Sequence, residues 1–475
     1  MAKAITVFLN QQEMDLIHAQ SVKSLQEIGI KVLSQPVLEI LEKNGARVDY
    51  KAMVAKIPEK MVNQALESVP KEFTLCGRDP KRDLRVPAKT YPWMTTSGLA
   101  IFVNDYETGE YRDSTRKDIA AFTRLGDAVD SADFLWTALT AKDVIPLAHG
   151  PHELWVTMQN TTKHVQGVTA QSAEDAKVQI ELAALIAGGK GELRKRPLFS
   201  VIVCPIAPLT FEQGSMEAQV ELAKAGIPVA SMSMSNGGVS CPLPVAGMLV
   251  NVNTENLGSI VISQMAAPGA PHIYCSESGP MDMRTARINY SSVEKVFLTI
   301  GLAQMAKRYS LPSLVADAGW GGDREACVSG VLTPATQLTG IMGGSDLVTG
   351  LGSIDSAKGI SFEQFIVDSY MWDCCKNYLH EVEISEEKIG LDAVKEVGHG
   401  HDFLTHPHTL KYLRGELAFW EKEKLDLLEM DEQELPAEAN KIVKSILAKH
   451  QVEPLANDLI EKGDAIIAKY EDIVG

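Results

Sequence analysis

The sequence predicts an α/β fold: a (β/α)8 barrel with an N-terminal α+β capping region and a C-terminal helical tail. From about Phe134 onward, short apolar or β-branched runs alternate with longer amphipathic segments, which is the pattern of βαβ units. Seven such runs follow one another in line, and no early GxGxxG marks the nucleotide-binding half of an open sheet. A closed parallel barrel is therefore favoured over a doubly wound sheet.

The barrel is predicted to occupy residues 121–415. Its expected strands lie at 134–139, 164–169, 198–204, 228–232, 272–275, 313–316 and 346–349. The expected helices between them lie at 173–187, 214–225, 255–266, 293–309, 331–342 and 362–378. The fold needs eight strands, and the pattern does not locate the eighth.

The two ends of the chain differ from the barrel segment. In residues 1–120, helical patterns at 12–28, 36–44 and 58–69 are followed by β-like runs, so a separate capping region is expected there. Residues 416–475 are charged and helical in pattern, which predicts a solvated helical tail or an oligomer contact.

Composition narrows the classes of partner. The chain has 45 Lys and Arg against 62 Asp and Glu, a net charge of -17. Nucleic acid and anionic membrane surfaces require a cationic footprint, so neither is expected as a partner. The seven cysteines are odd in number and show no CxxC spacing. With no secretory signal pattern at the N-terminus, reduced thiols in a cytoplasmic enzyme are expected.

The loops that follow the strands carry the chemistry of a barrel, and their residue types disfavour a metal hydrolase. Such an enzyme needs His or carboxylate ligands from several strands, and only His164 begins one. Four histidines gather in one later segment that Gly and Pro residues bend: His399, His401, His406 and His408. A hydrogen-bonded loop is favoured over a metal site there, and no metal is assigned.

A barrel lyase or aldolase stays open as an alternative. Lys142 follows the first predicted strand and Lys358 the seventh, and either could form a Schiff base. Asp143 makes a surface ion pair with Lys142 an equally good explanation of the first lysine. The glycine-rich segment 319–322 could cradle a phosphate, but no helix-opening GK[ST] accompanies it.

Aromatic residues at the strand ends suggest a third kind of site. Trp136, Tyr274 and Trp320 could surround a quaternary ammonium group, which has no N–H to donate and is best met by π faces. Buried Trp and Tyr residues in an ordinary core would give the same pattern, so both interpretations stay open.

Several long stretches decide between these alternatives. They lie at 96–100 with 105–112, at 237–239 with 250–251, at 268–271 with 281–285, and at 397–406. In this order they resemble the trimethylamine methyltransferase family, specifically its members that lack pyrrolysine and act on betaine-type quaternary amines. The likeness extends from about Gln12 to Arg414.

The resemblance implies a (β/α)8 barrel, a homo-oligomer, and a separate corrinoid protein that brings its cobalamin cobalt to the barrel mouth. No tightly bound cofactor is expected in this chain. Pyrrolysine in the trimethylamine enzymes lies after the sixth strand, and Gly330 stands at about that place here. A neutral tertiary amine is a poor methyl donor because it would leave as an amide anion. A chain without pyrrolysine should therefore prefer a quaternary amine, which leaves as a neutral tertiary amine.

The same resemblance implies roles for particular residues. The expected catalytic positions are Gly330, which leaves the space that pyrrolysine would fill, with Glu277 and Asn236. The expected substrate-binding residues are Trp136, Gln166, Tyr274, Arg284 and Trp320. The three aromatic residues would form the cage, and Asn236, Gln166 or Arg284 would orient a substrate carboxylate.

Carboxylates should lie away from the donor nitrogen, because its positive charge diminishes toward the transition state. Glu277 and Asp282 should therefore be distant from it or paired with Arg284. Neither a general acid nor a general base is required. A betaine-binding protein without catalytic activity on the same scaffold is the second alternative.

Overall fold

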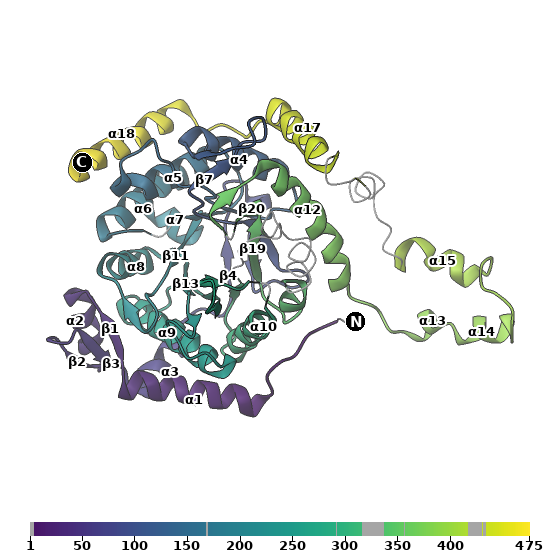
Figure 1. Cartoon of the computed structure of the whole chain (residues 1–475), viewed down its shortest axis with the longest axis horizontal. Coiled ribbons are helices and arrows are strands. Elements are labelled where there is room, and N and C mark those ends of the chain that lie inside the picture. Colours follow the sequence, from purple (N-terminus) through teal and green to yellow (C-terminus); the bar gives the residue numbers. More distant parts are fainter. Residues whose placement is uncertain are drawn as a thin grey trace.

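A computed structural model describes residues 4–167, 170–290, 292–315, 337–355, 357–416, 430 and 434–475. Eight parallel strands form the central sheet (Figure 1). Their order around it is β6 (Trp93–Thr96), β19 (Leu347–Leu351), β18 (Ser313–Val315), β15 (His272–Ser276), β13 (Val229–Ser233), β11 (Phe199–Val203), β10 (Val165–Gly167) and β9 (Leu135–Trp136). A parallel bridge between Thr95 and Phe134 joins the two edge strands. The predicted (β/α)8 barrel and all seven predicted strands are confirmed.

The eighth strand is β6, which precedes the other seven in sequence. It lies within residues 1–120, so the barrel takes its first strand from the segment predicted to form the cap. The sequence pattern missed it because β6 has only four residues and no helix follows it directly. A hairpin, β7 (Phe102–Asn104) and β8 (Tyr111–Asp113), comes first, and only then α4 (Arg116–Ala128). The division into three domains stays a prediction.

Helices surround the barrel in sequence order (Figure 1). They are α5 (His149–Gln159), α6 (Ala173–Ala187), α7 (Lys190–Lys195), α8 (Gln213–Ala225), α9 (Val245–Ala266), α10 (Val293–Arg308) and α12 (Phe362–Lys376). The predicted helix at 255–266 is only the second half of α9. Residues along most of α9 are buried on every side, because helices of the N-terminal region cover its outer face. The helix therefore lacks the polar stripe that the pattern requires. The first half of the helix predicted at 331–342 lies outside the described residues, and residues 337–341 of its second half are helical.

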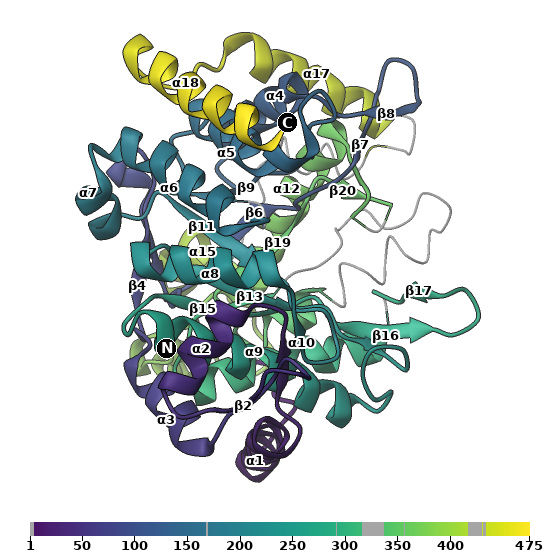
Figure 2. The ribbon, with the colours of Figure 1, turned by 90° about the vertical axis from the view of Figure 1, so that its left-hand side faces the viewer.

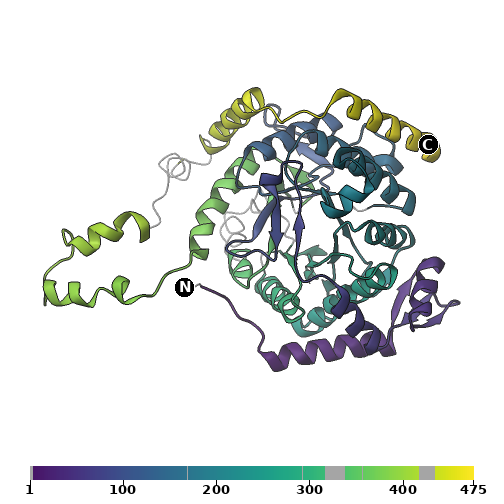
Figure 3. The same cartoon turned by 180° about the vertical axis from the view of Figure 1, so that it is seen from behind.

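The N-terminal region covers one side and one end of the barrel. Its elements are α1 (Gln11–Glu27), β1 (Ile30–Val32), α2 (Gln35–Lys43), β2 (Arg47–Asp49), β3 (Val54–Lys56), α3 (Glu59–Ser68), β4 (Phe73–Leu75), η1 (Pro80–Arg82) and β5 (Leu84–Val86). Helices α1 and α3 pack on α9. Seen from behind, the β4–β5 hairpin crosses the amino-terminal end of the barrel (Figure 3), where its apolar side chains join the interior core.

Two small sheets stand at the opposite end, on the loops that follow the strands. One contains β14 (Asn236–Gly237), β16 (Gly279–Asp282) and β17 (Arg287–Ile288), and its β16–β17 hairpin projects from the barrel (Figure 2). The other joins β7 and β8 to β20 (Ser353–Ile354) and β21 (Gly359–Ile360). A further short strand, β12 (Thr210–Phe211), pairs with β1. The short helix η2 (Pro146–Ala148) precedes α5.

After α12 and η3 (Asn377–Leu379) the chain leaves the barrel. Three helices, α13 (Glu386–Ile389), α14 (Leu391–Val397) and α15 (Pro407–Glu416), project from its side (Figures 1 and 3). The chain then returns as α17 (Glu434–Lys449) and α18 (Asn457–Val474), which pack on α12, α4 and α6. The predicted helical character of the tail is confirmed for these two helices, but they are not a solvated extension. Among the described residues, no helix has the length and apolar character to cross a bilayer.

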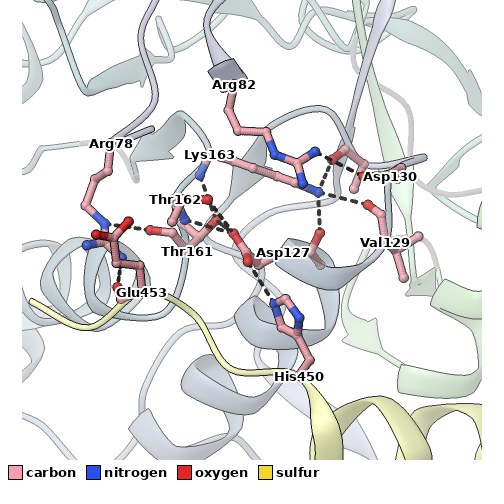
Figure 4. Close-up of polar contacts among 12 residues, drawn as sticks. Arg78, Arg82, Asp127, Val129, Asp130, Thr161, Thr162, Lys163, His450 and Glu453 are labelled. Atoms are coloured by element: carbon pink, nitrogen blue, oxygen red, sulfur yellow. Dashed lines mark hydrogen bonds and ion pairs between the residues drawn. The ribbon is translucent and has the colours of Figure 1, made fainter. Parts of the chain in front are cut away.

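A polar network attaches the tail to the barrel near the end of α4 (Figure 4). His450 Nε2 lies 2.8 Å from an Asp127 carboxylate oxygen, and Arg78 donates to the Glu453 carbonyl at 2.9 Å. Beside them, the buried Lys163 ammonium donates to the carbonyls of Gly126, Val129 and Ala132 at 2.7, 2.9 and 2.6 Å. Burial lowers the pKa of Lys163 to about 8, so the ammonium is still charged at neutral pH. It donates to two carbonyls at the end of α4, those of Gly126 and Val129, and to the Ala132 carbonyl in the turn that follows.

Replacing Lys163 with Met should destabilise the fold by about 2 to 4 kcal/mol, because the packing volume is kept while three carbonyls each lose the hydrogen bond from the ammonium. Urea denaturation followed by far-UV circular dichroism measures the loss. Lys177→Met, at an exposed position on α6, is the matched control and should change stability by less than about 0.5 kcal/mol. Equal midpoints for the two variants would contradict this role of Lys163.

Candidate active site

Mostly apolar side chains fill the barrel interior, with the buried His164 side chain 3.0 Å from the Ser200 hydroxyl among them, so a ligand site is expected at one of the barrel's ends. Because side chains alternate along a strand, one set faces inward and forms a core of its own: Phe134, Trp136, Ile202, Ala230, Met232, Ile273, Cys275, Leu314 and Leu347. The β4–β5 hairpin closes the amino-terminal end with Leu75, Leu84 and Val86. The site is therefore expected at the carboxyl ends of the strands.

Two of the predicted substrate-binding residues lie side by side there. Trp136 on β9 and Gln166 on β10 are direct partners in the parallel ladder, and both are buried. The Trp136 indole N–H and both polar atoms of the Gln166 amide have no hydrogen-bond partner among the described residues. A buried polar group without a partner costs about 1 to 3 kcal/mol, so these atoms are suited to bind a ligand.

Gly98, in the loop after β6, lies directly on the indole of Trp136. A Cβ at this position would be 2.1 Å from Trp136 Cε2, so any other residue would displace the ring. Thr95 and Thr96 hold the Trp136 backbone: the Trp136 N–H donates to Thr95 Oγ1 at 2.8 Å, and the Thr96 hydroxyl donates to the Trp136 carbonyl at 2.7 Å. The position of Trp136 is thus determined by the strand that closes the barrel.

The loops that carry Asn236 and Glu277 are adjacent, since the Glu277 N–H donates to the Ser233 carbonyl. They follow the neighbouring strands β13 and β15, and Asn236 pairs with Gly279 in the small sheet above them. The Asn236 side-chain oxygen is buried and has no partner among the described residues. The Glu277 carboxylate accepts a hydrogen bond from the Tyr290 hydroxyl at 3.1 Å. Its charge is therefore partly engaged by this donor.

A buried carboxyl that the sequence did not indicate supports these loops. Glu255, on α9, accepts from the Ser233 hydroxyl at 2.5 Å, from the Leu209 N–H at 3.0 Å and from the Asn251 amide at 3.1 Å. Burial raises its pKa. The sequence did not indicate Glu255, because functional residues of a barrel are expected at strand ends and Glu255 lies inside a helix. The available signal was a single acidic residue within a long stretch of apolar and small residues.

Two predicted binding residues lie elsewhere. Ile273 and Cys275 face the interior, so Tyr274 between them faces the helices, where its hydroxyl donates to Asn253 at 2.9 Å. Arg284 is at the exposed turn of the β16–β17 hairpin, with 89% of its side chain accessible, and it pairs with Asp282 at 3.1 Å. The expected Asp282–Arg284 pair is present. Neither Tyr274 nor Arg284 reaches the Trp136–Gln166 pair in this structure, because strand alternation and the hairpin direct them away.

Two other predicted residues, Trp320 and Gly330, lie outside the described residues, as does the glycine-rich segment 319–322. Trp136 is therefore the member of the expected cage that the structure places at the mouth.

The lysines of the aldolase alternative lack the environment that this chemistry requires. A Schiff-base lysine is activated by desolvation or by a neighbouring cation, but Lys142 and Lys358 are exposed. Asp143 pairs with Arg116 at 3.2 Å rather than with Lys142. The structure therefore gives this alternative no support.

The histidine segment belongs to the projecting helices, far from the barrel mouth (Figure 1). His406 lies 3.2 Å from a Glu396 carboxylate oxygen, and His408 lies 3.0 Å from the Glu387 carbonyl. These two side chains therefore form the hydrogen-bonded loop that the sequence favoured over a metal site. In the described part of the chain, no three His, Cys, Asp or Glu side chains gather as ligands for a metal ion.

A second buried acid holds the loop after β9. Glu153, on α5, is 1% exposed, and its carboxyl oxygen accepts from the Ala141 N–H at 3.1 Å. Burial raises the pKa of Glu153 to about 8. The group is therefore mostly protonated at neutral pH and adds no negative charge near the candidate site.

This pKa predicts how stability depends on pH. The folded chain keeps a proton on Glu153 that the unfolded chain releases above its ordinary value of 4.5. The contribution of Glu153 is therefore fully present below about pH 4.5 and is lost as the pH rises through about 8. Glu153→Gln imitates the protonated acid. Relative to wild type it should gain about 3 to 5 kcal/mol in the free energy of unfolding at pH 9, and little at pH 4.

Urea denaturation at a series of pH values tests this difference, with Glu181→Gln at an exposed position of α6 as the control. Parallel stability curves for wild type and Glu153→Gln would show that Glu153 ionises normally in the folded chain.

Comparisons with known proteins agree with this architecture. The model of the family described as Trimethylamine methyltransferase (MTTB) matches residues 2–475. A trimethylamine methyltransferase of Desulfitobacterium hafniense (strain DSM 10664 / DCB-2) is 32% identical, over 98% of this chain and 94% of its own length. A glycine betaine methyltransferase of Desulfitobacterium hafniense (strain Y51) is 28% identical, over 98% of each chain.

Among solved structures, the monomethylamine methyltransferase of Methanosarcina barkeri is similar with a TM-score of 0.52, over 93% of this chain and 89% of its own. The two sequences are 13% identical, so this likeness confirms the barrel fold alone.

Proposed function

Since this chain belongs to the trimethylamine methyltransferase family and is a methyltransferase, we propose that its methyl donor is a small quaternary amine of the betaine type. The proposed acceptor is the cobalt(I) of a separate corrinoid protein, which supplies the nucleophile. The carbon–nitrogen bond breaks with its electron pair left on nitrogen, so the product is a neutral tertiary amine. No proton has to move. The observation that carries this proposal is the buried Trp136–Gln166 pair, whose polar atoms have no partner among the described residues.

The surroundings of Trp136 suit a cation that must lose its charge. The side chains with which it packs are apolar, and a π face holds a quaternary ammonium by about 0.5 to 2 kcal/mol without fixing its charge. A carboxylate in contact with the nitrogen would stabilise the ground state more than the transition state and slow the reaction. We propose that the amide of Gln166, on the neighbouring strand, donates to a substrate carboxylate, because its polar atoms have no partner among the described residues.

Two facts favour a quaternary donor over trimethylamine. The sequence contains only standard amino acids, so no pyrrolysine is present to form a cationic adduct with a tertiary amine. A relative that covers nearly the whole chain is a glycine betaine methyltransferase. The roles of Gly330, Asn236 and Glu277 as catalytic positions, and of Trp320 in the cage, stay part of this proposal. So do a homo-oligomeric state, a cytoplasmic location and the absence of a resident cofactor.

Incubation with cob(I)alamin and a panel of glycine betaine, proline betaine, carnitine and choline should give methylcobalamin with at least one of them, followed by absorbance. Trimethylamine should be inert in the same assay, because it lacks a fourth carbon on nitrogen. Turnover of trimethylamine would refute the substrate class. Binding of a betaine by calorimetry without any methylation would identify a binding protein instead.

Substitutions at the pair should separate cation binding from carboxylate binding. Trp136→Ala should weaken the binding of every quaternary amine by about 10-fold, while Trp136→Phe should lose less because a π face remains. Gln166→Leu should weaken the binding of carboxylate-bearing betaines by about 10-fold and leave choline unchanged. Trp155→Phe, in the packing of the tail on α5, is the control and should bind normally. If Trp136→Ala bound like wild type, the cage assignment would be untenable.

A further inference from the structure

Four side chains that contain sulfur lie together on the inner face of the barrel near its mouth. Met232 on β13 and Cys275 on β15 are direct partners in the parallel ladder. Cys204 directly follows β11, the strand on the other side of β13, and Met234 directly follows β13 itself. All four pack in the same interior core as Trp136. We call Cys204, Met232 and Met234 the sulfur wall, because they are the members nearest the carboxyl ends of their strands.

The alternation of side chains along β13 produces this arrangement. From Ser231 to Asn236 the sequence alternates serine with Met232, Met234 and Asn236. Successive side chains of a strand point to opposite faces, so the two methionines share the interior face. The serines between them face α9, where the Ser233 hydroxyl donates to Glu255 at 2.5 Å.

Hydrogen bonds hold the backbone that carries the two methionines. Besides the bond from Ser233 to Glu255, the Ser235 N–H donates to the Ser278 hydroxyl at 2.8 Å, and that hydroxyl donates to the Ser233 carbonyl at 3.1 Å. Methionine is a flexible residue that adapts to irregular gaps. On a backbone fixed on both sides of Met234, its sulfur atom is restricted to a small region of the mouth.

Core packing alone does not account for the whole wall. Met232 and Cys275 are buried, as members of a core should be. Cys204 and Met234 are only half-buried, and they lie where the strands end and a ligand site is expected. Part of their surface is therefore accessible to a small molecule at the mouth.

Sulfur suits the group that the proposed function brings to this place. In a quaternary ammonium the positive charge is spread over the hydrogens of the methyl groups, which cannot donate as an N–H does. The lone pairs of sulfur are polarisable and uncharged. They attract these hydrogens without a fixed negative charge, which would stabilise the ground state more than the transition state.

We propose that the sulfur wall is the second side of the cation site, and that the quaternary ammonium binds between the sulfur atoms and the indole of Trp136. The expected cage was aromatic, but Tyr274 faces the helices, where its hydroxyl donates to Asn253. The sulfur wall supplies a surface that Tyr274 does not. This inference rests on the proposed quaternary donor and identifies further residues that bind it.

Calorimetry with matched pairs of ligands tests the sulfur wall. Choline and 3,3-dimethylbutan-1-ol have the same shape, as do glycine betaine and 3,3-dimethylbutyrate, but only the first of each pair has a charged centre. Wild type should bind the cationic member of a pair more tightly. Met232→Leu with Met234→Leu keeps the volume and apolar character of the wall but removes its sulfur. The preference for the cation should therefore fall by about 10-fold, while the neutral compound binds within about 2-fold of wild type.

The control is Met305→Leu, at a buried methionine on α10, which should keep the wild-type preference. Circular dichroism should be unchanged in all variants. A folded double variant with the wild-type preference for the cation would overturn the sulfur wall and leave the proposed function intact. Wild type that binds both members of each pair equally would contradict the cation site itself, and with it the proposed function.

Nuclear magnetic resonance detects the contact directly. In a deuterated chain with ¹³C-labelled methionine methyl groups, nuclear Overhauser effects from the N-methyl protons of choline should reach the ε-methyl groups of Met232 and Met234. Loss of one signal in each single Leu variant identifies these two among the 17 methionines. Effects confined to other methionines would refute the contact.

Discussion

Closure of the parallel sheet by β6 is the constraint on which the rest of this structure depends. Without it, β9 and β19 would each present a row of unpaired backbone groups. Strand β6 pairs with β19 and bridges to β9, and the side chains of Thr95 and Thr96 complete the contact through the backbone of Trp136. The same contact brings Gly98 onto the indole. The strand pairing that closes the barrel thus also positions Trp136 at the candidate site.

The closed barrel separates apolar from charged side chains. Most side chains of the interior core are apolar, and three carboxyls on the loops and helices around the mouth are engaged by specific partners. Glu277 is bonded to Tyr290, Glu255 to a serine network, and Asp282 to Arg284. A donor nitrogen at the mouth would therefore meet aromatic and apolar atoms first. This arrangement is consistent with a displacement in which the nitrogen becomes neutral.

The additions to the barrel differ in how they are held. The tail helices α17 and α18 are attached by buried side chains and by the polar network around Asp127. Their packing on the barrel therefore stabilises them. Among the described residues, no element of the barrel packs extensively on the projecting helices α13, α14 and α15. Several of their apolar side chains are exposed.

The sequence by itself determined the fold class and seven of the eight strands, because apolar runs of strand length alternated with amphipathic helices over a long segment. The family was indicated separately, by the resemblance of several long stretches. The sequence also indicated Trp136 and Gln166, since residues just inside the ends of strands face a common mouth. Only the tertiary structure decided that Tyr274 lies on the face of β15 that packs against the helices. A shift of one residue along a strand moves a side chain from the interior face to the outer face. The identification of β6 as the eighth strand, and of Glu255 as a supporting carboxyl, likewise required contacts between segments far apart in sequence. Local sequence patterns do not contain that information.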